Sequence, residues 1–147
     1  MIRQATKADI PALVKIGQRF AEYYPCKAKY NEAGVADSFA VIIDTGVILV
    51  AVKDGVITGG VAGVLCPLWY SPETIIAQEL AWWMEPEHRR GVDGIKILKA
   101  FEGWAKEKNA TLISISDLQI DGQYPIGILV ERLGYKLTER THIKEVL

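Results

Sequence analysis

The chain is short of the features that mark several classes of protein. Its two cysteines, Cys26 and Cys66, lie far apart and form no CxxC pair, so we expect reduced thiols, not a disulfide framework or a zinc knuckle. Seventeen Lys and Arg stand against 18 Asp and Glu, which gives a net charge of -1. Nucleic-acid binders need surplus positive charge, because much of their affinity comes from counterion release. The composition therefore argues against a nucleic-acid partner.

Long apolar segments are missing as well. The longest runs, Gly59 to Tyr70 and Ser38 to Val52, are interrupted by Pro67 and Asp44 and are too short to span a bilayer. Charged residues occupy the N-terminal positions where a signal peptide would carry its apolar region. We therefore expect a cytoplasmic protein without a membrane partner.

The remaining composition is that of a folded chain. Half of the 147 residues are apolar and 24% are charged, and the sequence holds no repeat or low-complexity linker. This predicts a single domain over residues 1–147. Hydrophobic periodicity places one continuous α/β unit along it, in the order β-α-α-β-β-β-α-β-α-β-β. The expected elements are strands at 1–5, 47–53, 56–65, 74–85 and 112–118, helices at 6–24, 32–45, 95–108 and 124–133, and a final pair of strands within 135–146.

Two local signals refine this outline. Asp54-Gly55 between two β-branched runs predicts a tight antiparallel hairpin. Glycines at 59, 60 and 63 within the following strand predict a bulge, or a place where another group approaches the backbone closely.

The segment from Glu79 to Gly94 is the most informative, because a strand there passes through a glycine-containing turn directly into a helix. Such a helix start offers unpaired backbone N–H groups and a positive dipole end to an anion. Arg89 and Arg90 lie at this point, so a diphosphate fits the chemistry. The alternative is purely structural: the glycines shape the turn, and Asp93 caps the helix with its carboxylate in the anion position.

The stretch from Pro86 to Ala105 resembles the acetyl-CoA-binding motif of the GCN5-related N-acetyltransferases (GNAT), R/Q-x-x-G-x-G/A followed by an amphipathic helix. The opening residues 2–6, the Asp54-Gly55 hairpin and Leu133-Gly134-Tyr135 look like that family too. The resemblance covers essentially the whole chain. It implies a single mixed, mostly antiparallel central sheet flanked by helices, with acetyl-CoA as acyl donor and an amine as acceptor.

The same resemblance implies which residues would hold the donor. Arg89 matches the first motif position and Gly94 the last, whereas Val92 falls where the family usually has its first glycine. A β-branched residue tolerates a positive φ poorly, and Asp93 adds a negative charge near the phosphates. The implied donor-binding residues are Trp83, Met84 and Glu85 through the backbone of a splayed strand, Arg89, Arg90, Gly91, Val92, Asp93, Gly94 and Ile95 around the pyrophosphate, and Gln123 near the cofactor arm.

Acetyl transfer to an amine also needs a base, because an amine with a pKa near 10 is mostly protonated at neutral pH. Glu79 is the best candidate, since it lies in an apolar strand where burial would raise its pKa. The family often uses a tyrosine as the acid, and that position here is Val130. Tyr124 could act instead, Ser116 could place a water, or the thiolate could leave without an acid.

The sequence leaves several hypotheses about acceptor, assembly and function open. The acceptor could be a small-molecule amine or an amine of a peptide or protein, and exposed aromatics would suit a homodimer. His88 and His142 share no metal-ligand spacing, so we expect no metal. The chain could instead be a non-catalytic acyl-CoA-binding or interaction protein on the same fold. A third reading is transfer of a longer acyl group, for which the small residues of 59–63 would leave room.

Overall fold

The computed structural model describes residues 1–26, 28–118 and 126–146. Five strands form one sheet in the order β1-β2-β3-β4-β5, in which β4 and β5 are parallel and the other neighbours antiparallel. The predicted fold class, a mixed and mostly antiparallel sheet flanked by helices, is therefore confirmed. The elements are β1 (Ile2–Gln4), η1 (Lys7–Asp9), α1 (Ile10–Tyr23), α2 (Glu32–Thr45), β2 (Val47–Lys53), β3 (Val56–Leu68), β4 (Ser71–Met84), η2 (Pro86–His88), α3 (Asp93–Glu107), β5 (Leu112–Ser114) and α4 (Gly127–Arg132).

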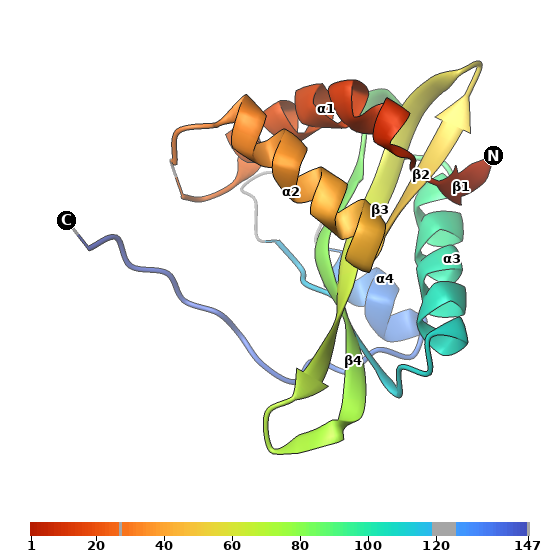
Figure 1. The fold of residues 1–147 in the computed structure, drawn as a ribbon. Helices are drawn as coiled ribbons and strands as arrows, with labels where there is room; N and C mark the ends of the chain where they lie inside the picture. Colours follow the sequence, from red (N-terminus) through yellow and green to blue (C-terminus); the bar gives the residue numbers. More distant parts are fainter. Residues whose placement is uncertain (27, 119–125, 147) are drawn as a thin grey trace.

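Helices cover both faces of the sheet. Figure 1 shows α1 and α2 on one side and α3 and α4 on the other. Each face has its own apolar core: Phe101 and Ile97 of α3 pack on one face, while Leu13 and Ile16 of α1 pack on the other. Burial on both faces explains why β2 reads as a continuous apolar run without polar alternation.

The predicted hairpin joins β2 and β3. Asp54 and Gly55 both have positive φ, 51° and 77°, as a two-residue turn of the primed type requires. The adjoining register, Lys53 against Val56, is antiparallel. This part of the prediction is confirmed.

A bulge in β4 changes which residues face which core. Ala62 pairs with Ala81 but Gly63 pairs with Glu79, so Leu80 is the extra residue. Before the bulge, Ala77 faces the α3 side; after it, Trp82 and Met84 contact that core, whereas Trp83 packs on the α1 side. Alternation along the strand therefore places Glu79 on the α3 side together with Ala77, and the bulge brings Trp82 and Met84 to that same side.

Neighbouring side chains occupy the space beside the glycines of β3. A Cβ on Gly63 would collide with the ring of Phe101, and one on Gly59 with Met84. At Gly60 it would lie 2.8 Å from the indole of Trp83. The predicted close approach of other groups is confirmed. The idea that residues 59–63 leave room for a longer acyl chain is wrong, because these side chains occupy the space.

The chain after α4 departs from the prediction. Gly134, at φ 96°, ends α4 as expected, and the hydroxyl of Tyr135 donates to Glu102 of α3 at 2.9 Å. The expected final pair of strands is wrong: residues 136–146 are exposed, and within the described chain none of them makes a hydrogen bond. Figure 1 shows this segment leading away from the helices and the sheet. Its pattern favours an extended backbone, but a strand also needs a neighbour to pair with.

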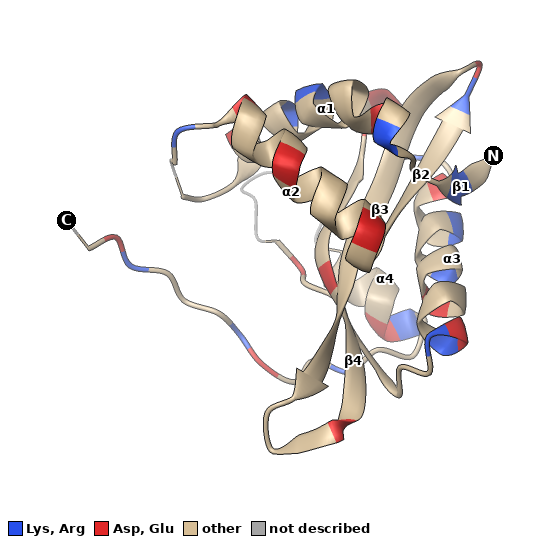
Figure 2. Ribbon diagram, viewed as in Figure 1, with Lys and Arg blue, Asp and Glu red and all other residues tan. Residues whose placement is uncertain are grey.

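Charges of both signs occur on α1 and α3, whereas α2 carries only acidic residues. Figure 2 shows Lys and Arg interspersed with Asp and Glu along α1 and α3, while β3 carries neither. No helix in the described ranges is long and apolar enough to cross a membrane. Cys26 and Cys66 are both free thiols.

Candidate active site

The candidate site lies where β4 and β5 part. The two strands pair only over three positions, Ile76 to Gln78 against Leu112 to Ser114. The strand expected at 112–118 is therefore too long, since β5 ends at Ser114. Beyond this point the side of β4 toward β5 has no neighbouring strand in the described chain. The bulge at Leu80 lies close to this level, two residues beyond the last paired position of β4.

Glu79 is the first residue of β4 beyond the part paired with β5. It is only 6% exposed, although it is charged in its ordinary state. Its Oε2 accepts a hydrogen bond from the backbone amide of Ser116 at 2.9 Å. Burial raises the pKa of the Glu79 carboxyl above its ordinary value, and the Ser116 amide partly offsets this by stabilising the ionised form. A carboxyl of this kind is suited to hold and release a proton.

Ser116 meets Glu79 through its main chain. The amide of Ser116 replaces a strand-to-strand hydrogen bond with one to a carboxylate, and the residue itself is exposed. The sequence pointed to Ser116 for a different reason, as a hydroxyl that could place a water. The structure brings these two candidate residues together, and the contact between them is made by the Ser116 amide.

The turn between β4 and α3 ends in a row of backbone donors. Gly91 donates to the carbonyl of His88 at 3.4 Å, and Lys96 donates to Val92 at 3.1 Å. Between and beside them, five N–H groups have no acceptor among the described residues; they belong to Arg90, Val92, Asp93, Gly94 and Ile95. Helix starts leave such donors unpaired, and they favour an anion at this point.

The two unusual motif residues adopt unstrained positions. Val92 has φ -89° and ψ -5°, so the turn does not require a positive φ where the resemblance implies a glycine. Asp93 is the first residue of α3, and its Oδ1 lies 3.6 Å from Nζ of Lys96. Its side chain makes no capping hydrogen bond within the described chain. The alternative in which Asp93 caps the helix and fills the anion position is therefore wrong.

The backbone at the end of β4 is partly engaged. The Glu85 amide donates to the carbonyl of Thr58 at 2.9 Å, and the Met84 carbonyl accepts from Nε of Arg89 at 3.0 Å. Trp83 and Met84 also pair with Gly60 and Gly59 of β3. Of the three residues expected to offer free backbone groups, Glu85 thus has its amide occupied.

Two residues of α1 that the sequence did not single out contact the turn. Nη2 of Arg19 lies 2.9 Å from Oε1 of Glu85, and the guanidinium carbon of Arg89 lies 5.4 Å from the ring centre of Tyr23. Arg19 and Tyr23 are four residues apart and so share one face of α1. Only that spacing was visible in the sequence, since their partners lie 66 residues further along the chain.

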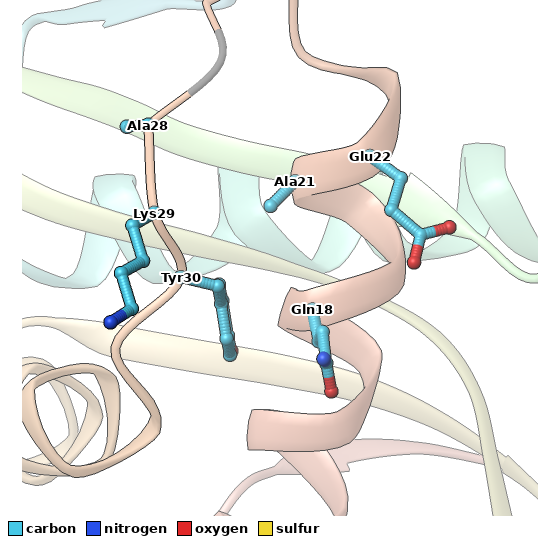
Figure 3. A pocket seen from close by; sticks show the side chains of 6 residues that line it. All are labelled: Gln18, Ala21, Glu22, Ala28, Lys29 and Tyr30. Carbon is cyan, nitrogen blue, oxygen red and sulfur yellow. The ribbon is translucent and has the colours of Figure 1, made fainter.

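A groove opens beside α1. Figure 3 shows the side chain of Tyr30 lying between the α1–α2 loop and α1, with Gln18 and Glu22 on the helix and Lys29 on the loop. The groove measures about 430 Å³. The Tyr30 hydroxyl donates to the carbonyl of Val14 at 2.6 Å, which fixes the loop against the helix.

Other expected residues lie elsewhere. Gln123 and Tyr124 fall outside the described residues. Val130, at the position of the family tyrosine, is 8% exposed and packs in the core on the α3 side. Trp69, one of the exposed aromatic residues, is 88% exposed and lies at the β3–β4 turn. No group of His, Cys, Asp and Glu in the described part of the chain is arranged to hold a metal ion.

Comparison with known proteins identifies which solved structures share this fold. No protein-family model matches the chain, and no curated protein matches it in sequence. An acetyltransferase structure from Clostridium acetobutylicum with acetyl-CoA is similar at a TM-score of 0.79 and 16% identity, covering 99% of this chain and 95% of that one. A GNAT family acetyltransferase of Staphylococcus aureus has a TM-score of 0.70 at 18% identity, with 99% and 98% covered.

A third similar structure is an aminoglycoside acetyltransferase from an uncultured soil metagenomic sample, in complex with sisomicin. Its TM-score is 0.72 at 16% identity, and the match covers 100% of this chain and 95% of that one. The likeness to these structures extends over the whole chain. The protein therefore has the GNAT acetyltransferase fold.

Proposed function

We propose that this protein transfers the acetyl group of acetyl-CoA to a primary amine by direct attack in a ternary complex. The observation that carries the proposal is the buried carboxyl of Glu79 at the divergence of β4 and β5, with its pKa raised by burial. The fold supports it, because a similar structure was solved with acetyl-CoA and others are acetyltransferases.

The unpaired donors of the turn would hold the donor's pyrophosphate. Amides of Arg90 and of the residues from Val92 to Ile95 have no acceptor in the described chain, and a diphosphate presents several oxygens to such a row. The exposed guanidinium of Arg90 would add a charge-assisted contact. The Arg89 guanidinium would keep the turn in place through the Met84 carbonyl.

Glu79 would take the proton of the amine, directly or through one water. The amine nitrogen then forms its bond to the thioester carbonyl carbon, and a free amide of β4 beyond the bulge would stabilise the oxyanion. The nitrogen of this intermediate gives up its second proton to water, collapse breaks the C–S bond, and the electron pair leaves with the sulfur. The products are an N-acetyl amine and CoA. The proton for the thiolate would come from Tyr124, from a water placed by Ser116, or from solvent.

The test is release of free CoA on addition of an amine panel that includes sisomicin, lysine and a peptide with a free N-terminus. We expect CoA release with at least one class of amine, and its loss in Glu79→Gln. Unchanged turnover in Glu79→Gln would remove this residue from the mechanism.

The alternative is an acyl-CoA-binding protein without transferase activity. The buried Val130, which replaces the family tyrosine with a side chain unable to donate a proton, favours it. This alternative predicts calorimetric binding of acetyl-CoA together with no CoA release above buffer hydrolysis for any amine. Absence of heat at millimolar acetyl-CoA would contradict both functions.

A further inference from the structure

The segment that leads from β4 into α3 carries three acidic side chains in the same stretch of chain as the free amides. Glu85 and Glu87 precede those amides along the chain, and Asp93 lies among them. Near a diphosphate, each carboxylate without a countercharge raises the free energy of the bound state. Asp93 has Lys96 beside it at 3.6 Å. Glu85 is the more shielded from water, because its side chain is only 15% exposed.

Arg19 supplies the countercharge of Glu85 from another element. Its Nη2 lies 2.9 Å from Oε1 of Glu85, and its own side chain is 52% exposed. The pKa of the Arg19 guanidinium is raised, first by the hydrogen bond to Glu85 and further by the charges of Glu85, Glu87 and Glu22. Arg19 thus lies in a locally negative field that belongs largely to the turn.

A backbone hydrogen bond holds the Arg19–Glu85 ion pair in place beside the turn. The amide of Glu85 is held by the carbonyl of Thr58, so the residue cannot follow Arg19 away from the sheet. One helical turn further along α1, Tyr23 lies under the Arg89 guanidinium. Helix α1 therefore contacts the beginning of the turn at Glu85 and its middle at Arg89.

We propose that Arg19 is a positioning residue for the acyl-CoA donor: by neutralising Glu85 it lowers the Kd for a diphosphate held by the amides of residues 90–95. The inference rests on the proposed function, because it concerns the same donor. It assigns to α1 a role in donor affinity that is separate from any contact with the acceptor.

Lys15 provides a matched control for Arg19. It lies one turn earlier on α1, is exposed, carries the same charge and has no ion pair in the described chain. The variants Arg19→Gln and Lys15→Gln therefore remove the same charge from the same helix, and only the first leaves Glu85 without its partner.

The experiment is calorimetric titration of the full chain with acetyl-CoA at low and moderate salt. We expect Arg19→Gln to raise the Kd about fivefold at low salt, and Lys15→Gln to change it less than about twofold. The double variant Arg19→Gln with Glu85→Gln should return to within about twofold of wild type, because no uncompensated carboxylate remains. In turnover, the KM for acetyl-CoA should rise in Arg19→Gln while kcat stays unchanged.

A mechanical role for the ion pair gives a different pattern. If Arg19 only clamps the turn, the double variant stays as weak as Arg19→Gln, and that result overturns the proposal. Equal shifts for Arg19→Gln and Lys15→Gln overturn it as well. In either case binding by wild type leaves the proposed function standing, whereas a wild type that produces no heat at millimolar acetyl-CoA overturns both.

Discussion

The carboxylate of Glu79 accepts a hydrogen bond from the backbone amide of Ser116 at 2.9 Å, at the level where β4 and β5 cease to pair. A buried carboxylate thus takes the place of a strand-to-strand contact. Glu79 lies on the α3 side because it alternates in phase with Ala77, and the bulge at Leu80 follows directly after it. The bulge, the end of the β4–β5 pairing and the candidate base therefore lie next to one another.

The raised pKa of Glu79 predicts the pH dependence of turnover. A base must be ionised to accept a proton, so kcat/KM should rise with pH through a pKa above the ordinary 4.5 of a glutamate. Glu79→Gln should lower kcat/KM about 100-fold or more and remove this limb. The measurement is a pH–rate profile of both proteins. A control, Glu107→Gln at the exposed end of α3, should keep the wild-type profile.

Glu79 should make the protein less stable to unfolding as pH rises, whereas it should make turnover faster. A carboxyl whose pKa is raised in the folded state stabilises the fold at low pH, and this contribution is lost as pH rises through the folded pKa. At pH 8 Glu79→Gln should therefore be at least as stable as wild type in urea unfolding. A strongly destabilised variant would contradict this, and would assign its loss of activity to unfolding.

Two glycine-to-alanine changes should act in opposite directions. At Gly63 a Cβ would collide with the Phe101 ring, so Gly63→Ala should destabilise the protein by about 1 to 3 kcal/mol. At Gly103 in α3 a Cβ meets nothing within 4 Å, so Gly103→Ala should stabilise it by about 0.5 to 1 kcal/mol. Urea unfolding measures both. Equal tolerance at the two positions would mean that the space beside β3 is open after all.

The sequence predicted most of this fold because its signals are local. The Asp54-Gly55 turn, the apolar stripe of α3 and the helix end at Gly134 each depend on neighbouring residues, and all three are present. Glu79 was identifiable from its apolar strand. The partners of long-range contacts were not: the Ser116 amide, and the ion pair from Arg19 to Glu85, depend on how distant segments pack. The length of β5 and the fate of residues 136–146 depend on strand neighbours in the same way.

The two unusual motif residues should differ in their effect on donor binding. Val92 already has a helical backbone, so Val92→Gly should leave the Kd for acetyl-CoA within about twofold of wild type. Asp93→Asn removes a negative charge from the start of α3 and should tighten binding about two- to fivefold at low salt. Calorimetry compares the two variants. Tighter binding by Val92→Gly would show that the valine strains the bound turn.

The C-terminal segment should exchange its amide hydrogens rapidly. Residues 136–146 make no hydrogen bond within the described chain, whereas Val50 in the middle of β2 is fully buried. Hydrogen exchange followed by NMR should therefore show little protection at 136–146 and strong protection at β2. Protection of the segment in dilute protein would indicate that the final strands do form.

The account depends most on the row of amides at the start of α3. Titration of the labelled protein with acetyl-CoA, followed by backbone amide shifts in NMR, tests it directly. We expect the largest shifts at Arg90 and at Val92 to Ile95, with smaller shifts beside Glu79. No shift at millimolar acetyl-CoA, or shifts confined to a surface away from this turn, would contradict the proposed donor site.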